Sequence, residues 1–182
     1  NFNISQDLNK LGVVNQTTML ASDTQEIINL FTNTFQTIHK TNDTSQYVAN
    51  TRDTLCYATH ENQESTLNLL KHNTDLAIVV GGYNSSNTTH LVELSSQTTK
   101  TYFINSSDKI KLNNSICHFD IKTKKEITTY DFMPDNKCKI ILTSGASCPD
   151  IILENILLKL AELKKEIISQ KDIISNFSKK YE

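Results

Sequence analysis

The sequence of 182 residues predicts an α/β fold, with a mostly parallel sheet flanked by helices. Short apolar runs alternate along the chain with amphipathic stretches of helical period. The run at 76–80 has no polar alternation, which is typical of a parallel strand covered on both faces. Three of the apolar runs lead through a loop of small polar residues into a helix. In such sheets ligands bind at the carboxyl ends of the strands.

The first part of the chain predicts a strand, a helix and a linker. Residues 11–15 form a short apolar run before the polar loop Gln16-Thr17-Thr18, as expected for a buried strand. From 22 to 38, apolar side chains recur at steps of three and four, with Ser22 as the expected N-cap. Residues 39–50 are polar almost throughout, which predicts a linker or a domain boundary.

The middle of the chain predicts two helices around a buried strand. Residues 51–59 form a turn segment that contains Cys56. Residues 61–72 predict a helix, whose inward side chains are expected to be Leu67, Leu69 and Leu70. A strand at 75–82 then leads through a Gly-Gly and Asn-Ser-Ser-Asn loop into a helix that holds Leu91, Val92 and Leu94.

The last part of the chain predicts two further parallel strands and a long helix. The strands are expected at 101–104 and 139–143, and the stretch between them holds short strands at 116–121 and 126–130 or irregular crossovers. The loop at 144–150 opens the long helix. In that helix Pro149 is the expected first residue, and three lysines are expected near the end: Lys159, Lys164 and Lys165.

Charge and composition exclude several classes of protein. The net charge of -2 gives no long-range field that would attract nucleic acid or an anionic membrane. No apolar run approaches the roughly 20 residues that cross a bilayer. The cysteines lack the spacing of a zinc ribbon, and a chain this long needs no disulfide bonds, so a reducing compartment is expected. The four are Cys56, Cys117, Cys138 and Cys148.

Three loops that precede helices carry small hydroxyl or amide side chains, at 16–18, 84–87 and 145–149. The positive end of a helix dipole favours an anion, so together these loops predict a phosphate or diphosphate site without a lysine. Each Ser or Asn could instead simply cap its own helix. Gly81 and Gly82 match neither a P-loop nor a GxGxxG motif, so a nucleotide-binding doubly wound domain is the weaker alternative.

Taken by itself, Cys56 is open to two interpretations. It has no CxxC neighbour, so a buried, inert thiol is the ordinary explanation, and a metal ligand in a polar turn is the other. The five histidines show no HxH or HExxH arrangement. No Ser-His-Asp or paired-carboxylate constellation follows from the spacing, so hydrolytic catalysis has no support.

Four motifs carry a family resemblance. They are Val-Asn-Gln-Thr-Thr-Met-Leu at 14–20, Thr-Leu-Cys-Tyr-Ala-Thr at 54–59, Val-Gly-Gly-Tyr-Asn-Ser-Ser-Asn-Thr at 80–88 and Thr-Ser-Gly-Ala-Ser-Cys-Pro-Asp at 143–150. In this order and at this spacing they resemble the hydroxymethylbutenyl diphosphate reductases, the LytB/IspH family. The resemblance runs from about 11 to 165 and covers the C-terminal half, or somewhat more, of a complete family member.

The resemblance implies the last step of the non-mevalonate isoprenoid pathway. That step reduces 4-hydroxy-3-methylbut-2-enyl diphosphate to isopentenyl and dimethylallyl diphosphates, with two electrons, two protons and a 4Fe-4S cluster whose open iron site meets the substrate hydroxyl. The implied fold is three similar α/β domains in a pseudo-threefold arrangement around the cluster, each supplying one cysteine. Residues 1–50 then correspond to the C-terminal part of the second domain plus a linker, 51–168 to the third domain, and 169–182 to a tail.

Matched residue by residue, the resemblance makes Cys56 the third cluster cysteine. Thr17 corresponds to a residue near the substrate hydroxyl and its proton path, and Gln16 and Thr59 to supporting residues of the pocket. The diphosphate contacts correspond to Ser85, Ser86, Asn87 and Ser147. The cysteines away from the family's ligand positions are predicted to be bystanders, namely Cys117, Cys138 and Cys148.

The other functional residues of the family lie in its N-terminal half, which this sequence does not contain. They are two cluster cysteines, the diphosphate-binding histidines and a proton-delivering glutamate. Cys56 alone cannot complete a three-cysteine site, so the chain by itself is predicted to be an inactive fragment. The competing hypothesis is a non-enzymatic α/β domain that binds a phosphate ligand and kept the fold without the cluster.

Two features resemble the cyanobacterial and plastid branch of the family. They are Tyr83 in the serine loop and the long stretch at 105–136. This resemblance implies a plastid-type organelle, either an apicoplast or a chloroplast stroma, with bacterial cytoplasm as the alternative. It also implies a ferredoxin or flavodoxin-type electron donor.

Overall fold

The computed structural model of the chain describes residues 9–49 and 56–164. The chain divides into two compact units, residues 1–63 and 64–182, and the division falls within helix α3 (Tyr57–Leu70). The domain boundary expected after residue 50 falls at 50–55, outside the described residues. The three predicted domain limits therefore stay predictions.

The first unit contains a small parallel pairing closed by a helix. Strand β1 (Leu11–Gly12) pairs in parallel with β2 (Val48–Ala49), and helix α2 (Ala21–His39) connects them. The strand expected at 11–15 is thus present but shorter, and the polar stretch after α2 holds a strand that its composition did not indicate. Aromatic stacking holds this connection, because the ring of Tyr47 lies 3.9 Å from the ring of His39.

The start of α2 corrects a prediction. Ser22 is not the N-cap: Leu20 occupies that position without a side-chain cap, and the Ser22 hydroxyl donates instead to Asp23 Oδ1 at 3.2 Å. At the other end Lys40 adopts a left-handed backbone conformation, with φ at 48°, and its N–H donates to Gln36 O. The helix itself is confirmed over nearly the whole expected range.

The second unit is built on a three-stranded parallel sheet. Its strands are β3 (Leu76–Val80), β4 (Lys100–Ile104) and β8 (Ile140–Ser144), in the order β4-β3-β8. Helix α4 (Ser86–Ser96) connects β3 to β4, and α5 (Asp150–Leu163) follows β8. The expected mostly parallel α/β arrangement is confirmed, and β3 lies at the centre of the three-stranded sheet.

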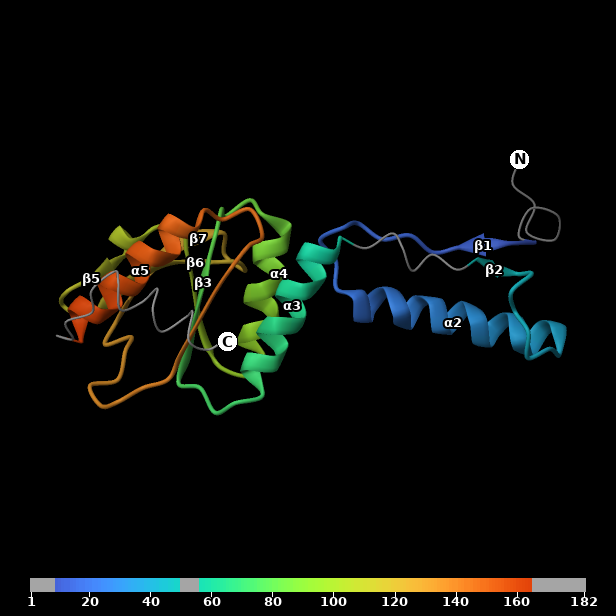
Figure 1. The fold of residues 1–182 in the computed structure, drawn as a ribbon, viewed down its shortest axis with the longest axis horizontal. Coiled ribbons are helices and arrows are strands. Elements are labelled where there is room, and N and C mark those ends of the chain that lie inside the picture. The colour runs from blue at the N-terminus through green and yellow to red at the C-terminus, as the bar shows by residue number, and fades with distance from the viewer. Residues whose placement is uncertain (1–8, 50–55, 165–182) are drawn as a thin grey trace, which may run out of the picture. The chain divides into compact units, whose positions relative to one another are not determined.

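Both faces of β3 are covered, as its continuous apolar run predicts. Every side chain of β3 is buried. On one face Ile78 belongs to the core cluster that contains Ile156 of α5. On the other face Val79 belongs to the cluster that contains Leu91 of α4. Figure 1 shows α4 and α5 on opposite sides of β3.

The stretch between β4 and β8 forms a second, antiparallel sheet. After a short 3-10 helix (Ser107–Lys109), strands β5 (Ile110–Lys111), β6 (Ser115–Asp120) and β7 (Lys125–Tyr130) pair in sequence order. The short strands expected at 116–121 and 126–130 are confirmed. The sheet contacts the parallel core through aromatic rings, including Tyr102 of β4 edge-on to His118 of β6 at 4.9 Å.

Helix α3 corrects a second prediction, because it buries a polar face. The helix starts four residues earlier than expected, and Leu67 and Leu69 are 43% and 46% exposed instead of facing inward. The buried side chains on the helix are those of Thr59, Gln63 and Thr66. Thr66 is 1% exposed and shares a buried hydrogen bond of 3.0 Å with Thr143 of β8.

The ends of α5 also differ from expectation. Pro149 is the N-cap, in an extended conformation, and the first helical residue is Asp150. Lys164 caps the other end, and its amine donates to the carbonyl groups of Pro134, Asp135 and Asn136. Lys159 pairs with Glu162 at 2.9 Å, and Lys165 lies outside the described residues. Among the helices of the described ranges, none is long and apolar enough to cross a membrane.

Candidate functional site

The carboxyl edge of the parallel sheet forms a cavity. Val80 lies opposite Ile104 and Ser144 in the strand register, so the three strands end at one level. The residues that follow them, Gly81, Asn105 and Gly145, all line a cavity of about 250 Å³. This is the edge at which open parallel sheets bind ligands.

The remaining walls of the cavity come from the starts of α4 and α5. These walls consist of Gly82, Thr88, Ser147, Cys148, Pro149 and Ile152. No cationic side chain is among the lining residues. An anion in this cavity would be held by backbone N–H groups, hydroxyl groups and the positive ends of two helices. The predicted anion site stays a prediction, and the third loop expected to contribute to it, 16–18, belongs to the first unit.

Thr88 packs closely against the residues that follow two of the strands. The sequence analysis did not identify this residue. A Cβ atom at Gly81 would lie 2.5 Å from Thr88 Oγ1, and one at Gly145 would lie closer still to the same atom. Only glycine therefore fits at both strand ends while Thr88 keeps its position. In the sequence, only the glycines at the two strand ends could have indicated this contact. That both of them meet Thr88 depends on how α4 packs against the strands.

The start of α4 is capped by a serine of its own loop, as the alternative to an anion site expects. Ser85 is the N-cap, and its Oγ accepts from the Thr88 backbone N–H at 3.3 Å and from Thr88 Oγ1 at 3.0 Å. Ser86 is exposed. Asn87 is 6% exposed, and its side-chain oxygen has no hydrogen-bond partner among the described residues. This oxygen can only accept, so a donor such as water would complete its hydrogen bonding, and only Nδ2 of Asn87 could donate to an anion.

The start of α5 offers a second set of donors beside Ser147. Ser147 is exposed and lines the cavity, and Pro149 gives the helix no side-chain cap. The carboxylate of Asp150 also lies in the first turn of α5, where it competes with any other anion for the helix dipole. The neighbouring Cys148 has its pKa raised by burial and by the charge of Asp150, so its thiol stays protonated at neutral pH.

The candidate metal ligand, Cys56, lies in the first unit, immediately before α3. Hydrogen bonds from the Thr59 hydroxyl and backbone N–H, together with the Ala58 N–H, lower the pKa of the Cys56 thiol below its usual value. The backbone carbonyl of Cys56 accepts from the His60 N–H at 3.0 Å. Because the thiolate is the form that binds metals, this position fits a metal or cluster ligand.

The loop that holds Gln16 and Thr17 lies against α3 within the same unit. The loop turns at Gln16, whose carbonyl oxygen accepts from the Met19 N–H at 2.9 Å. Gln16 and Thr17 are exposed, and Gln63 of α3 donates from Nε2 to the Thr18 carbonyl at 3.3 Å. Gln63 therefore positions this loop, a role that the sequence did not indicate.

The predicted site residues thus fall into two groups, one in each unit. Cys56, Thr59 and the Gln16-Thr17 loop belong to the first, and the serine loop and Ser147 belong to the second. In the part of the chain that the structure describes, no group of three or more His, Cys, Asp or Glu side chains could hold a metal ion.

Comparison with known proteins identifies relatives of this chain. It is 40% identical over 167 residues to the 4-hydroxy-3-methylbut-2-enyl diphosphate reductase of Gloeothece citriformis. The aligned region covers 91% of this chain and 41% of that protein. The enzyme of the same name from Prochlorococcus marinus (strain MIT 9515) is 41% identical over 156 residues, covering 84% of this chain and 38% of that protein. The chain thus spans about two-fifths of the length of these relatives.

A solved structure shares the fold. The E-1-hydroxy-2-methyl-but-2-enyl-4-diphosphate reductase from Plasmodium falciparum superimposes with a TM-score of 0.59 at 22% identity, over 100% of this chain and 52% of that one. A family model described as LytB protein matches residues 2–161, which is most of the sequence. This chain therefore belongs to the LytB protein family.

Proposed function

We propose that this chain is the C-terminal part of an iron-sulfur reductase that converts 4-hydroxy-3-methylbut-2-enyl diphosphate into isopentenyl and dimethylallyl diphosphates. Membership of the LytB family and the names of the cyanobacterial relatives support the reaction. The relatives are more than twice as long, so the activity is assigned to the complete polypeptide, with this chain inactive by itself. Its residues 1–50, 51–168 and 169–182 form the end of the second domain, the third domain and a tail.

The observation that carries the proposal is the setting of Cys56. The thiol is met by donors from Thr59 and Ala58 at the start of α3, which favour its ionised form. Cys56 would hold one iron of a 4Fe-4S cluster, and two further cysteines would come from the rest of the complete polypeptide. When bound, the cluster would pass two electrons, one at a time, from the external donor to the substrate, whose hydroxyl group would leave as water as two protons are taken up.

The cavity at the sheet edge is assigned to the diphosphate. Ser147 lines it directly, and Ser85, Ser86 and Asn87 begin the helix that contributes Thr88 to its wall. Hydroxyl and amide groups at two helix starts bind the diphosphate oxygens without adding positive charge. In the first unit, Thr17 is assigned to the surroundings of the substrate hydroxyl and its proton path, with Gln16 and Thr59 as supporting residues.

The cyanobacterial relatives also bear on the partner and the compartment. We assign the protein to a plastid-type organelle, with bacterial cytoplasm as the alternative, and a ferredoxin or flavodoxin as its electron donor. The donor is tested by measuring turnover of the complete polypeptide with each reduced protein in turn. Turnover with neither donor, in an enzyme that is active with a chemical reductant, would contradict this assignment.

The cluster assignment is tested with the complete polypeptide, expressed and purified without oxygen. Cys56→Ser should abolish the visible absorbance and the EPR signal of the cluster. Cys117→Ser is the matched control, because Cys117 lies on β6 of the antiparallel sheet, and it should leave both signals unchanged. An intact cluster spectrum in the Cys56→Ser protein would refute the assignment. A complete polypeptide that binds diphosphates but no cluster would instead support the non-enzymatic binding domain.

The anion site is tested by steady-state kinetics. Ser147→Ala and Asn87→Ala each remove a hydrogen bond to a charged group, worth about 1.5–3 kcal/mol, so KM should rise by about 10- to 150-fold. Ser96→Ala is the matched control, because Ser96 is exposed at the last turn of α4, and its KM should not change. Unchanged KM in both the Ser147→Ala and the Asn87→Ala protein would contradict the assignment of the diphosphate to this cavity.

A further inference from the structure

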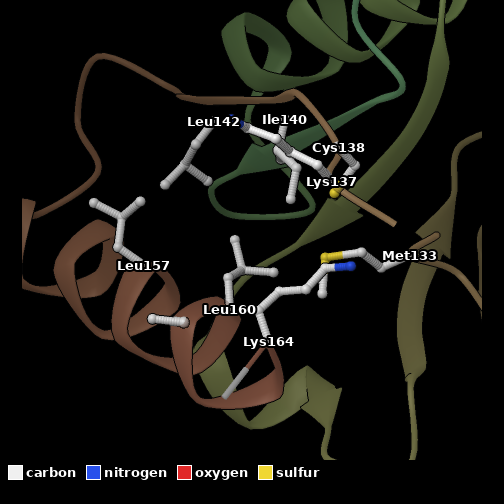
Figure 2. Close-up of a pocket in the computed structure, with 9 residues that line it drawn as sticks. Met133, Lys137, Cys138, Ile140, Leu142, Leu157, Leu160 and Lys164 are labelled. Carbon is white, nitrogen blue, oxygen red and sulfur yellow. The ribbon is translucent and has the colours of Figure 1, made fainter. Parts of the chain in front are cut away.

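Two hollows of the second unit differ in the groups that they offer to a ligand. The larger one, of about 380 Å³, is mostly apolar, and Figure 2 shows Leu157 and Leu160 of α5 facing Leu142 of β8 across it. Lys164 on its rim already donates to the carbonyl groups of residues 134–136. The cavity at the sheet edge is smaller, but the hydroxyl groups at the start of α4 lie beside it. The direction in which these hydroxyl groups donate therefore affects what that cavity can bind.

The hydroxyl group of Ser85 accepts two hydrogen bonds from a single residue. The Thr88 backbone N–H donates to Ser85 Oγ at 3.3 Å, and Thr88 Oγ1 donates to the same atom at 3.0 Å. A hydroxyl oxygen has two lone pairs and one proton. Because both lone pairs of Ser85 Oγ are used, this group can form a further hydrogen bond only by donating its proton.

The side chain of Thr88 is held in place by packing. It is 1% exposed, and its Oγ1 lies against the backbone at both Gly81 and Gly145, where an added Cβ atom would overlap it. Rotation of the side chain would therefore require the ends of two strands to move. The single proton of the Thr88 hydroxyl is used on Ser85, so the same group cannot also donate to a ligand.

Ser85 Oγ lies at the edge of the sheet-end cavity. A Cβ atom at Gly145, which lines the cavity, would be 3.8 Å from Ser85 Oγ. Ser85 is only partly buried, so its hydroxyl group is not sealed inside the protein. The oxygens of a diphosphate accept hydrogen bonds and do not donate them when ionised. A hydroxyl group that can only donate is therefore matched to such a ligand.

We infer that Thr88 is a positioning residue that commits the Ser85 hydroxyl to donate into the cavity, and so favours a ligand that only accepts hydrogen bonds. Thr88 acts through Ser85 and does not contact the ligand itself. The inference rests on the proposed function, in which Ser85 contacts the diphosphate. Without the Thr88 hydroxyl, one lone pair of Ser85 Oγ would be free, and water could donate to it and compete with the orientation that binds the anion.

The test measures KM for the substrate and the inhibition constant of inorganic diphosphate in the complete polypeptide. Thr88→Val removes the hydroxyl and keeps the branched shape, so both constants should rise about three- to tenfold, as for the loss of a hydrogen bond between neutral groups. The value of kcat should not change, because the contact is equally strong in the ground state and the transition state. Thr88→Ser should restore both constants. Thr89→Val is the matched control, because the Thr89 hydroxyl donates at 3.0 Å to the backbone carbonyl of Ser85, and it should change neither constant.

A double-mutant cycle with Ser85→Ala separates a positioning role from a direct or general structural one. Ser85→Ala alone removes a hydrogen bond to a charged group and should raise both constants about 10- to 150-fold. Adding Thr88→Val to Ser85→Ala should cause no further rise, since the group through which Thr88 acts is already gone. A further rise in the double variant would overturn the inference.

The same cycle separates failure of the inference from failure of the proposed function. If Ser85→Ala raises the constants and Thr88→Val does not, the inference is wrong and the diphosphate assignment stands. If Ser85→Ala has no effect, the assignment of Ser85 to the diphosphate is wrong, and the inference fails with it. Where thermal melts show that Thr88→Val does not fold, Thr88→Ala removes the same hydroxyl with a smaller side chain, and the same outcomes decide.

Discussion

Replacing Gly145 with alanine should destabilise the protein through one neighbour, Thr88. The added methyl group would overlap Thr88 Oγ1, because a Cβ at this position lies well inside the normal contact distance of that atom. Inserting a methyl group into a well-packed site typically costs about 1–3 kcal/mol. The contact is with a short side chain anchored by its hydrogen bond to Ser85, so we expect about 2 kcal/mol.

A double-mutant cycle isolates this contact. In a Thr88→Ala background the offending Oγ1 is gone, and the remaining Thr88 Cβ would lie an ordinary 3.5 Å from the new methyl group. Gly145→Ala should then cost less than about 0.5 kcal/mol, which gives a coupling energy of about 1.5 kcal/mol between the two sites. Thermal unfolding of the complete polypeptide and its variants, followed by calorimetry, measures each corner of the cycle.

The control is a neighbouring glycine with open space around it. A Cβ at Gly82 meets no atom within 4 Å, and no glycine among the described residues has a positive φ, so Gly82→Ala should be neutral or slightly stabilising. The reasoning would be refuted if Gly145→Ala cost the same with and without the Thr88 side chain. An equal loss at Gly82 would show that both glycines serve chain flexibility rather than close contact.

Three further predictions address other contacts of the second unit. Tyr83→Phe removes a hydrogen bond of 2.7 Å to the carboxylate of Glu126 on β7, so thermal melts should show a free energy of unfolding lower by about 1 kcal/mol. The control Tyr130→Phe changes an exposed side chain and should leave the free energy of unfolding unchanged. Thr66→Val leaves the buried Thr143 hydroxyl unpaired and should lower the free energy of unfolding by about 1–3 kcal/mol. In the same melts, the variant with valine at both positions should lose less than the sum of the losses from the two single changes. The raised pKa of Cys148 means that its reactive thiolate forms only at higher pH than in a free thiol, so iodoacetamide alkylation, followed by mass spectrometry, should have its midpoint above the usual thiol range. A midpoint at or below that range would contradict the burial of this sulfur.

The parallel core could be predicted because its signal is local. The five apolar residues of β3 carry no polar alternation, and the structure buries every one of them between α4 and α5. The loops at 84–87 and 145–149 follow directly from strands in the sequence, so their place at the carboxyl edge of the sheet also followed. The lining of the cavity by Ser147 agrees with that expectation.

The buried face of α3 could not be predicted because its partners are distant in sequence. Thr66 is buried through a hydrogen bond to Thr143, which lies 77 residues later, and no local pattern indicates this pairing. The apolar pattern favoured Leu67 and Leu69 as the inward side chains, and both are largely exposed. The role of Thr88 was hidden for the same reason, since its fit requires segments from three parts of the chain.

The order of strands in the parallel sheet bears on how the chain folds during synthesis. Strand β3 pairs with β8 along its whole length, yet β4 and the entire antiparallel sheet are made before β8. Until β8 arrives, one edge of a fully apolar strand stays open, and such edges are prone to aggregation. Soluble yield should therefore improve when chaperones that shield such edges are co-produced.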